Sequence, residues 1–351
     1  MHLLDNITLQ EKLDPEDMYH KIIHLPEHII ETYGNSDIFK PMEFNNLDLN
    51  NIKNVVICGM GGSAISGDIA ASAFGKTIPI HVIKDYTPNY ITKNTLVICC
   101  SYSGNTAETL SCLEQTLKVT PYISAVTSGG KMGEILDKKY FQVNLEPGMP
   151  PRSAIGFLFF SVIRILEEFQ IIPKQTEVVK KLVASLVQKA NAISNNKEFS
   201  HNIAKTASEK IKNKIPLIYG TDPDFAALAY RWKCQINENA KYPAFFHVFP
   251  EMNHNEIEGW ESEYFKQNFI PIFLSKFSQK EKYQKRINAF KELMDNQGIE
   301  YLEFFAEGET LVEKIFSLIY LGDIISYYLA ILMNVNPTTI KFIDFLKEKI
   351  D

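Results

Sequence analysis

The chain has 351 residues, of which 45% are hydrophobic and 22% are charged, a composition too apolar for a disordered protein. This length suits two domains of ordinary size, at roughly 100–200 residues each. The formal net charge of −6 argues against a protein that mainly coats nucleic acid or anionic lipid. Five cysteines without a CxxC pair argue against both a disulfide scaffold and a zinc ribbon.

Two segments bear on the compartment of the protein. The N-terminal residues lack a cationic stretch followed by an apolar core, so no signal peptide is predicted. Residues 315–333 are long and apolar enough to imitate a membrane span, but Asp323 interrupts them. A carboxylate is costly in lipid, so we predict a buried helix there. A cytoplasmic protein that does not enter a membrane is therefore expected.

The first half of the chain alternates strands and helices after a helical pattern over residues 15–33. Strands are predicted at residues 54–59, 78–83, 94–101, 121–128 and 140–145, with helices at 63–74 and 107–117. Short β-rich runs that alternate with helices predict a parallel, doubly wound α/β sheet. Such a sheet binds ligands in the loops at the carboxyl ends of its strands.

The second half repeats this rhythm after two helices, at residues 153–169 and 176–193. Strands follow at residues 215–220, 244–250, 269–275 and 301–308, with helices at 226–241, 279–296 and 315–333 and a last helix near the end. The predicted fold is α/β with two doubly wound domains, residues 1–172 and 173–351. Each domain would be a mainly parallel sheet flanked by helices.

A glycine-rich segment, GMGGSAISG at residues 59–67, follows the first long strand. Glycines let the backbone approach a ligand, and the next helix offers free N–H groups with a partial positive charge. The segment therefore predicts an anion site, although a tight turn without a ligand is the alternative. It also fits a dinucleotide fingerprint, because Gly59, Gly61 and Ala64 satisfy GxGxxA and Asp85 lies about 20 residues further on.

A second loop, SYSGNT at residues 101–106, follows another predicted strand and favours a phosphate over a dinucleotide. Ser101, Ser103 and Thr106 place three hydroxyls around a glycine at a helix start, which suits one phosphate group. A dinucleotide fold does not require such a cluster, whereas a sugar-phosphate pocket does. The alternative is that these side chains only form turns and cap the helix.

These segments carry a resemblance to a known family. GMGGSAISG and SYSGNTAET are similar to the sugar isomerase (SIS) domain, and PGMPPRSAIGF, NENAK and NHNEIEGW resemble the bifunctional phosphoglucose/phosphomannose isomerases, a branch of the phosphoglucose isomerase superfamily. The resemblance implies two SIS-type domains and a homodimer whose active site is completed by the second subunit. It also implies that the substrate phosphate is held by Gly62, Ser63, Ser101, Ser103 and Thr106.

Three catalytic roles follow from the same resemblance. Glu238 in NENAK matches the base that moves a proton between C1 and C2 of the sugar, whereas most helical glutamates are solvated. Arg152 in PPR matches the arginine that stabilises the enediolate, the alternative being a guanidinium that reaches water. His254 in NHNEIEGW matches a ring-opening histidine that reaches the partner subunit's active site, although a lone loop histidine is usually structural.

The C-terminal segment is matched less firmly. The family has a lysine near the chain end that assists ring opening, and Lys347 matches it best, with Lys341 and Lys349 as alternatives. The tolerance of mannose is attributed in the family to room and a small hydroxyl beside C2, which Thr338 or Thr339 would supply.

The expected activity is a metal-free and cofactor-free isomerisation of hexose 6-phosphates through a cis-enediolate. The substrates would be glucose 6-phosphate and fructose 6-phosphate, together with mannose 6-phosphate, which suggests a place in glycolysis and gluconeogenesis. No nucleic acid is expected as a partner. Two rivals stay open, a non-catalytic SIS protein that senses a sugar phosphate and an NAD-binding oxidoreductase that uses the fingerprint above.

Overall fold

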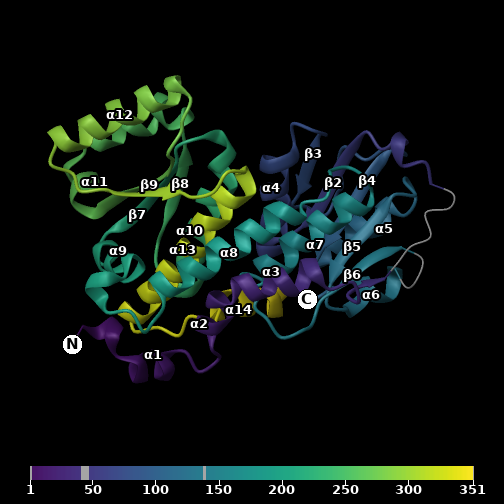
Figure 1. Ribbon diagram of the computed structural model, residues 1–351, viewed down its shortest axis with the longest axis horizontal. Coiled ribbons are helices and arrows are strands. Elements are labelled where there is room, and N and C mark those ends of the chain that lie inside the picture. The colour runs from purple at the N-terminus through teal and green to yellow at the C-terminus, as the bar shows by residue number, and fades with distance from the viewer. Residues whose placement is uncertain (1, 41–46, 137–139, 351) are drawn as a thin grey trace. The chain divides into compact units, whose positions relative to one another are not determined.

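The structure is a computed structural model that describes residues 2–40, 47–136 and 140–350. The chain divides into two compact units (Figure 1): unit 1 comprises Met1–Ile23 and Ser185–Asp351, and unit 2 comprises His24–Ala184. The first 23 residues therefore belong with the second half of the chain. This division differs from the predicted domains, 1–172 and 173–351, and each unit is described below by itself.

Unit 2 is built on a six-stranded sheet of order β1-β6-β5-β4-β2-β3. The strands are β1 (Phe39–Lys40), β2 (Asn54–Gly59), β3 (Ile80–Ile83), β4 (Thr95–Cys100), β5 (Ile123–Thr127) and β6 (Phe141–Asn144). All neighbouring strands pair in parallel except β1, which is antiparallel to β6. Every residue of β4 and β5 is buried, as expected for a parallel sheet that is covered on both faces.

Helices cover both faces of this sheet. The helices of unit 2 are α3 (Leu25–Gly34), α4 (Gly61–Phe74), α5 (Ala107–Thr116), α6 (Gly130–Leu136), α7 (Ile155–Glu168) and the first half of α8 (Thr176–Ile193). Cys112 of α5 and Met132 of α6 pack against Cys58 and Cys99 in one core cluster, while α4 contacts α7. The predicted doubly wound α/β sheet is confirmed.

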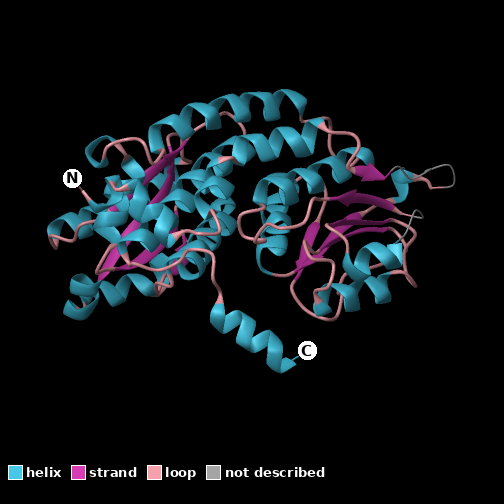
Figure 2. Cartoon of the chain, turned by 90° about the horizontal axis from the view of Figure 1, so that it is seen from below, coloured by secondary structure: helices cyan, strands magenta, loops and turns pink. Residues whose placement is uncertain are grey.

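Unit 1 contains a four-stranded parallel sheet of order β10-β9-β7-β8. The strands are β7 (Ile215–Gly220), β8 (Phe245–Val248), β9 (Phe269–Lys276) and β10 (Leu302–Ala306). The helices are α1 (Ile7–Leu13), α2 (Met18–Ile23), α9 (Ile203–Ile211), α10 (Ala226–Ala240), α11 (Glu263–Asn268), α12 (Glu281–Asn296), α13 (Leu311–Leu332) and α14 (Lys341–Ile350). Figure 2 shows helices on both sides of each sheet, so both units have the predicted architecture.

The predicted helical segment at residues 15–33 consists of two helices, because the helical pattern is broken near Pro26. α2 ends at Ile23 and α3 begins at Leu25, with Pro26 in its first turn. Proline lacks a backbone N–H, so it fits the first turn of a helix and disrupts a helix interior. The two helices belong to different units.

The apolar segment near the C-terminus is the buried helix α13, as predicted. Its length and composition would suffice to cross a membrane, but its most apolar 18-residue window is entirely buried. Asp323 in the middle of α13 is 3% exposed and accepts a hydrogen bond from Arg231 of α10 at 2.5 Å. The carboxylate that interrupts the apolar run therefore serves helix packing inside unit 1.

Candidate active site

The glycine-rich turn in unit 2 lies at the carboxyl end of β2, where α4 begins. Gly61 has a φ of +49°, a conformation that glycine adopts without strain. A Cβ atom on Gly62 would lie 2.7 Å from the carbonyl oxygen of Pro151 and 3.0 Å from the backbone nitrogen of Arg152. The turn is thus in close backbone contact with the segment that carries Arg152, a contact that excludes any side chain at residue 62.

The hydroxyl-bearing loop of residues 101–106 lies beside this turn. Gly59 and Cys100 are register partners in β2 and β4, so both loops start at the same edge of the sheet. The hydroxyls of Ser101 and Thr106 are 2.8 Å apart. The hydroxyl of Ser63 accepts a hydrogen bond from the backbone N–H of Tyr102 at 3.4 Å.

The predicted phosphate ligands differ in exposure. Ser63 and Ser101 are buried, and Thr106 is half-buried at the start of α5. Ser103 is exposed, and its hydroxyl accepts a hydrogen bond from the N–H of Asn105 at 3.3 Å. The structure therefore brings together three of the four predicted hydroxyl groups at one sheet edge and leaves Ser103 at the outer rim.

Tyr102 connects this loop to the Arg152 segment, and the sequence analysis did not single it out. Its hydroxyl donates to the carbonyl of Glu146 and accepts from the N–H of Met149 at 3.3 Å. The only sequence signal was its place between two predicted phosphate ligands. Tyr102 therefore ties the hydroxyl loop to the loop that precedes Arg152.

Arg152 is 4% exposed and lies in a turn directly before α7. The turn is closed by hydrogen bonds from the N–H of Ser153 to Pro150 (2.9 Å) and from the N–H of Ala154 to Pro151 (3.3 Å). Arg152 is therefore a buried side chain rather than one directed to water. In unit 2 it belongs to the same group of connected loops as Ser63 and Ser101.

In unit 1, Glu238 lies in the last turn of α10 and lines a groove of about 710 Å³. The groove is lined from α10 by Asn237 and Glu238, from the residue after it by Lys241, and from the C-terminal segment by Val335, Asn336, Thr339, Ile340, Lys341, Phe342 and Ile343. The structure therefore places the predicted base beside one of the two candidate threonines and one of the three candidate lysines. Lys347 and Lys349 lie further along α14 and are exposed.

Lys241 joins the two sides of this groove. Its ammonium group donates to the carbonyls of Glu238 (2.8 Å) and Asn239 (3.2 Å) at the end of α10. It also donates to the carbonyls of Asn336 (2.6 Å) and Pro337 (3.2 Å). A cation stabilises the carbonyl end of a helix dipole, so Lys241 both caps α10 and fixes the following segment to it.

That segment is held further by Asn336, whose side-chain oxygen accepts hydrogen bonds from the N–H groups of Thr338 (2.7 Å) and Thr339 (3.3 Å). The side-chain amide of Asn336 donates to Glu16 at 2.8 Å. Both candidate threonines are thus held by their backbone in a defined turn beside the groove.

The helix that carries Glu238 is anchored on α13 by polar contacts within an apolar interface. Besides the pair of Arg231 with Asp323, the side chain of Asn239 donates to Ser326 at 2.9 Å. The indole N–H of Trp232 donates to the carbonyl of Leu318 at 2.9 Å. Directional contacts in the middle and at the end of α10 fix both its rotation and its position on α13.

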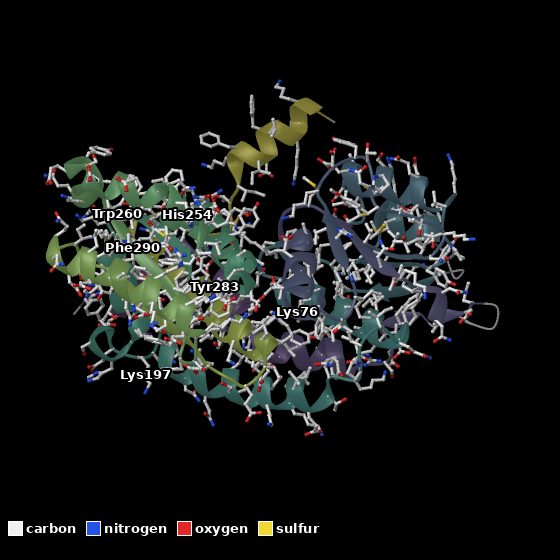
Figure 3. All side chains as sticks on the ribbon, turned by 90° about the horizontal axis from the view of Figure 1, so that it is seen from above. Lys76, Lys197, His254, Trp260, Tyr283 and Phe290 are labelled. Atoms are coloured by element: carbon white, nitrogen blue, oxygen red, sulfur yellow. The ribbon has the colours of Figure 1, made fainter. Side chains whose placement is uncertain are left out.

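His254 is exposed and ends the first of two short 3₁₀ helices, Glu251–His254 and Glu256–Glu261. Met252 and Trp260 on either side of it are buried. Figure 3 shows His254, Trp260 and Phe290 in the same part of unit 1. His254 is not one of the described residues that line the Glu238 groove.

The second sheet has loops that correspond to the two hydroxyl-bearing loops but carry different chemistry. β7 and β9 are adjacent parallel strands, as β2 and β4 are in the first sheet. At their carboxyl ends the ammonium group of Lys276 lies 3.0 Å from the carboxylate of Asp222 and 3.7 Å from that of Asp224. An ion pair with one extra carboxylate thus replaces the hydroxyl cluster.

Comparisons with known proteins agree with the fold described above. A family model described as the bacterial phospho-glucose isomerase C-terminal SIS domain matches residues 200–350. A bifunctional phosphoglucose/phosphomannose isomerase from Caldicellulosiruptor bescii is 36% identical over 338 residues, 95% of this chain and 98% of the relative. Another, from Aquifex aeolicus, is 33% identical over 86% of this chain and 92% of the relative. The structure of a hypothetical protein from Thermus thermophilus has a TM-score of 0.77 at 13% identity, covering 99% of this chain and 92% of that one.

The two helix-flanked, mainly parallel sheets define a protein of the SIS class. Within that class, the chain belongs to the family of bifunctional phosphoglucose/phosphomannose isomerases. The predicted fold class and the resemblance drawn from the five motifs are both confirmed.

Proposed function

We propose that this chain is an aldose–ketose isomerase that interconverts glucose 6-phosphate and fructose 6-phosphate, and also mannose 6-phosphate and fructose 6-phosphate. The observation that carries the proposal is the cluster formed by Ser63, Ser101 and Thr106 at the carboxyl ends of adjacent strands. Relatives that match most of the chain are named bifunctional phosphoglucose/phosphomannose isomerases. Neither a sensor nor an NAD-dependent oxidoreductase is favoured by these relatives.

The proposed phosphate site uses both hydroxyls and backbone. Ser63, Ser101 and Thr106 donate O–H groups to the phosphate oxygens, and the amino end of α4 adds free N–H groups and a partial positive charge. Gly62 contributes its backbone to this site, since its side-chain position is filled by the carbonyl of Pro151. Ser103, at the exposed rim, completes the set. The phosphate fixes one end of the sugar, so the reacting carbons are held in a constant position.

Isomerisation then needs a base for one carbon-bound proton. In the open-chain aldose, Glu238 removes the proton from C2, and the electrons of that C–H bond form the C1–C2 double bond of a cis-enediolate. The proton on the O2 hydroxyl is transferred to O1, and Glu238 returns its proton to C1 to give the ketose. Arg152 stabilises the negative oxygen of the enediolate. The overall reaction therefore requires no external oxidant or reductant.

Ring opening precedes this step because the sugar phosphates are cyclic in water. His254 of the partner subunit donates a proton to the ring oxygen as the O1 hydroxyl loses its own, and Lys347 assists. The protein would therefore act as a homodimer with active sites shared between subunits. Thr338 or Thr339 leaves room beside C2, so that both epimers are accepted. The cytoplasm, and a role in glycolysis and gluconeogenesis, are part of the same proposal.

A coupled assay on glucose 6-phosphate and mannose 6-phosphate, run side by side, tests the activity. Incorporation of solvent deuterium at C2 of recovered glucose 6-phosphate separates an isomerase from a sensor. Glu238→Gln should lower turnover by about 10³-fold or more with little change in substrate affinity, because the base is lost and the phosphate contacts stay. Glu292→Gln, at an exposed position of α12 in the same unit, is the matched control and should leave turnover unchanged. Near-normal turnover of Glu238→Gln would exclude it as the base.

A further inference from the structure

The segment that carries His254 is attached to unit 1 through one buried tyrosine. Tyr219 lies near the end of β7 and is 0% exposed. Its phenol oxygen accepts a hydrogen bond from the indole N–H of Trp260 at 3.0 Å. The Glu256 carboxylate lies near enough to this phenol to raise its pKa. A residue on the C-terminal side of His254, Trp260, is therefore tied directly to the Tyr219 hydroxyl.

The buried surroundings of Tyr219 favour its neutral phenol. Burial raises the pKa of the Tyr219 phenol well above its ordinary value, and the nearby Glu256 carboxylate raises it further. A neutral phenol oxygen accepts hydrogen bonds, and here it accepts one from the indole N–H of Trp260.

The ring of Tyr219 is itself held firmly. Its centroid lies 5.6 Å from that of Phe273, 5.6 Å from that of Phe290 and 6.0 Å from that of Phe249, in tilted and edge-on arrangements that aromatic rings favour. Trp260 contacts Phe290 as well, with centroids 6.4 Å apart. The hydroxyl of Tyr219 is thus a fixed point in the core of unit 1.

Between its anchors the His254 segment has little support of its own. The N–H of Asn255 donates to the carbonyl of Met252 at 3.4 Å, and the N–H of Glu256 donates to the side chain of Asn255 at 2.6 Å. Both contacts are local. The position of the exposed His254 imidazole therefore depends on the core contacts of Met252 on one side and of Ile257 and Trp260 on the other.

We propose that Tyr219 is a positioning residue for ring opening, because its hydroxyl holds Trp260 and thereby fixes the segment from which His254 reaches the ring oxygen. The inference rests on the proposed function, since it takes the ring-opening role of His254 as given. Tyr219 does not touch the sugar and takes no part in the proton transfer between C1 and C2.

The test compares a cyclic substrate with one that is always open. 5-Deoxyfructose 6-phosphate lacks the hydroxyl that closes the furanose ring, so its isomerisation requires no ring opening. Tyr219→Phe should lower turnover of fructose 6-phosphate by about 10-fold, which is less than the roughly 100-fold or greater loss expected on removing a general acid. Turnover of 5-deoxyfructose 6-phosphate should stay within about twofold of the wild type.

Tyr301→Phe is the matched control, since Tyr301 packs against the same cluster and its hydroxyl lies beside Asp295 instead. It should leave both turnover numbers unchanged. Hydrogen–deuterium exchange of residues 252–260 gives a readout independent of activity: Tyr219→Phe should accelerate exchange there, and Tyr301→Phe should not.

Equal losses on both substrates, or no loss on either, would overturn the positioning role of Tyr219. If Tyr219→Phe fails to fold, Trp260→Phe removes the N–H donor and keeps an aromatic ring, and the same selective loss is expected. A wild-type protein that isomerises neither substrate would instead refute the proposed function itself, so the two failures are distinguishable.

Discussion

Arg231 in α10 and Asp323 in α13 form a buried ion pair, with the guanidinium nitrogen 2.5 Å from the carboxylate oxygen and both side chains at most 4% exposed. Burial raises the pKa of Asp323, and the charge of Arg231 opposes that rise. The pair connects α10, which carries Glu238 in its last turn, to the buried apolar helix α13. It therefore links the position of the proposed base to the core of unit 1.

Removing one partner of this pair should be costly. Asp323→Ala would leave the Arg231 charge buried without its partner, and we expect the free energy of unfolding to fall by about 3–5 kcal/mol. Urea unfolding followed by tryptophan fluorescence measures this in unit 1, because Trp232 and Trp260 are the two tryptophans of the chain. The double variant Arg231→Met with Asp323→Leu should lose less, and an equal loss would contradict this explanation.

Gly62 should tolerate no side chain. In Gly62→Ala the new Cβ would lie 2.7 Å from the Pro151 carbonyl oxygen, so the glycine turn and the Arg152 segment must move apart. We expect KM for fructose 6-phosphate to rise about 10-fold, with a stability loss of about 1–3 kcal/mol. Gly133→Ala, where the new Cβ meets nothing within 4 Å, is the control. Unchanged KM in Gly62→Ala would contradict the close contact.

Ser101 should contribute to phosphate affinity more than to turnover. Its hydroxyl lies 2.8 Å from that of Thr106 in a buried position, and a hydrogen bond to a charged group contributes about 1.5–3 kcal/mol. Ser101→Ala should therefore raise KM by about 10- to 100-fold and weaken inhibition by inorganic phosphate in parallel. Ser111→Ala, whose hydroxyl donates to the Tyr86 carbonyl, should leave both unchanged. A loss confined to kcat would argue against a phosphate contact.

Lys241 should influence turnover through the base and the C-terminal segment. Lys241→Met removes the ammonium group that joins the end of α10 to Asn336 and Pro337. We expect kcat to fall about 10-fold with KM within about twofold, since misplacing a proton-transfer group lowers the rate of the chemical step. Lys241→Arg should recover part of the activity, and Lys285→Met, at an exposed helix position, should retain it. A rise in KM alone would contradict this role.

His28 should make the stability of unit 2 depend on pH. It is stacked on Phe157 at 4.5 Å, and burial, helped by nearby His24, lowers its pKa from 6.5 to about 4. Below pH 6.5 the unfolded chain binds a proton at this residue that the folded chain does not, so stability falls between pH 6.5 and 4. In urea unfolding followed by circular dichroism, His28→Gln should lose less stability than the wild type between pH 7.5 and 4.5. The exposed His201→Gln should behave as the wild type, and equal losses in all three proteins would refute the assignment.

The strands and most helices were predictable because their signals are local. Residues 54–59 and 215–220 were predicted as strands and form β2 and β7 with the same bounds, since short apolar β-branched runs between turns suit a covered parallel sheet. The segment at 15–33 is helical as predicted, but its apolar spacing continues across Pro26 and does not reveal the boundary between α2 and α3.

The candidate site was predictable where function requires a local motif, and not where it depends on contacts between distant segments. The hydroxyls of Ser101 and Thr106 share one loop, and the loop was recognised. Tyr219 meets Trp260 across 41 residues of sequence, and neither periodicity nor spacing signals such a contact. The sequence contains only a weak indication of the role of Lys241. It is a cation at the predicted end of a helix, where a positive charge interacts favourably with the helix dipole.

The ion pair of Lys276 with Asp222, at the strand ends of the second sheet, bears on where a phosphate dianion would bind. Asp222 and Asp224 both lie near Lys276, so the cation of this edge already has carboxylate neighbours, whereas the matching edge of the first sheet offers hydroxyls and a helix amino end. We therefore expect a phosphate dianion to prefer the first edge. The same sheet architecture thus occurs twice in one chain with different chemistry in its loops.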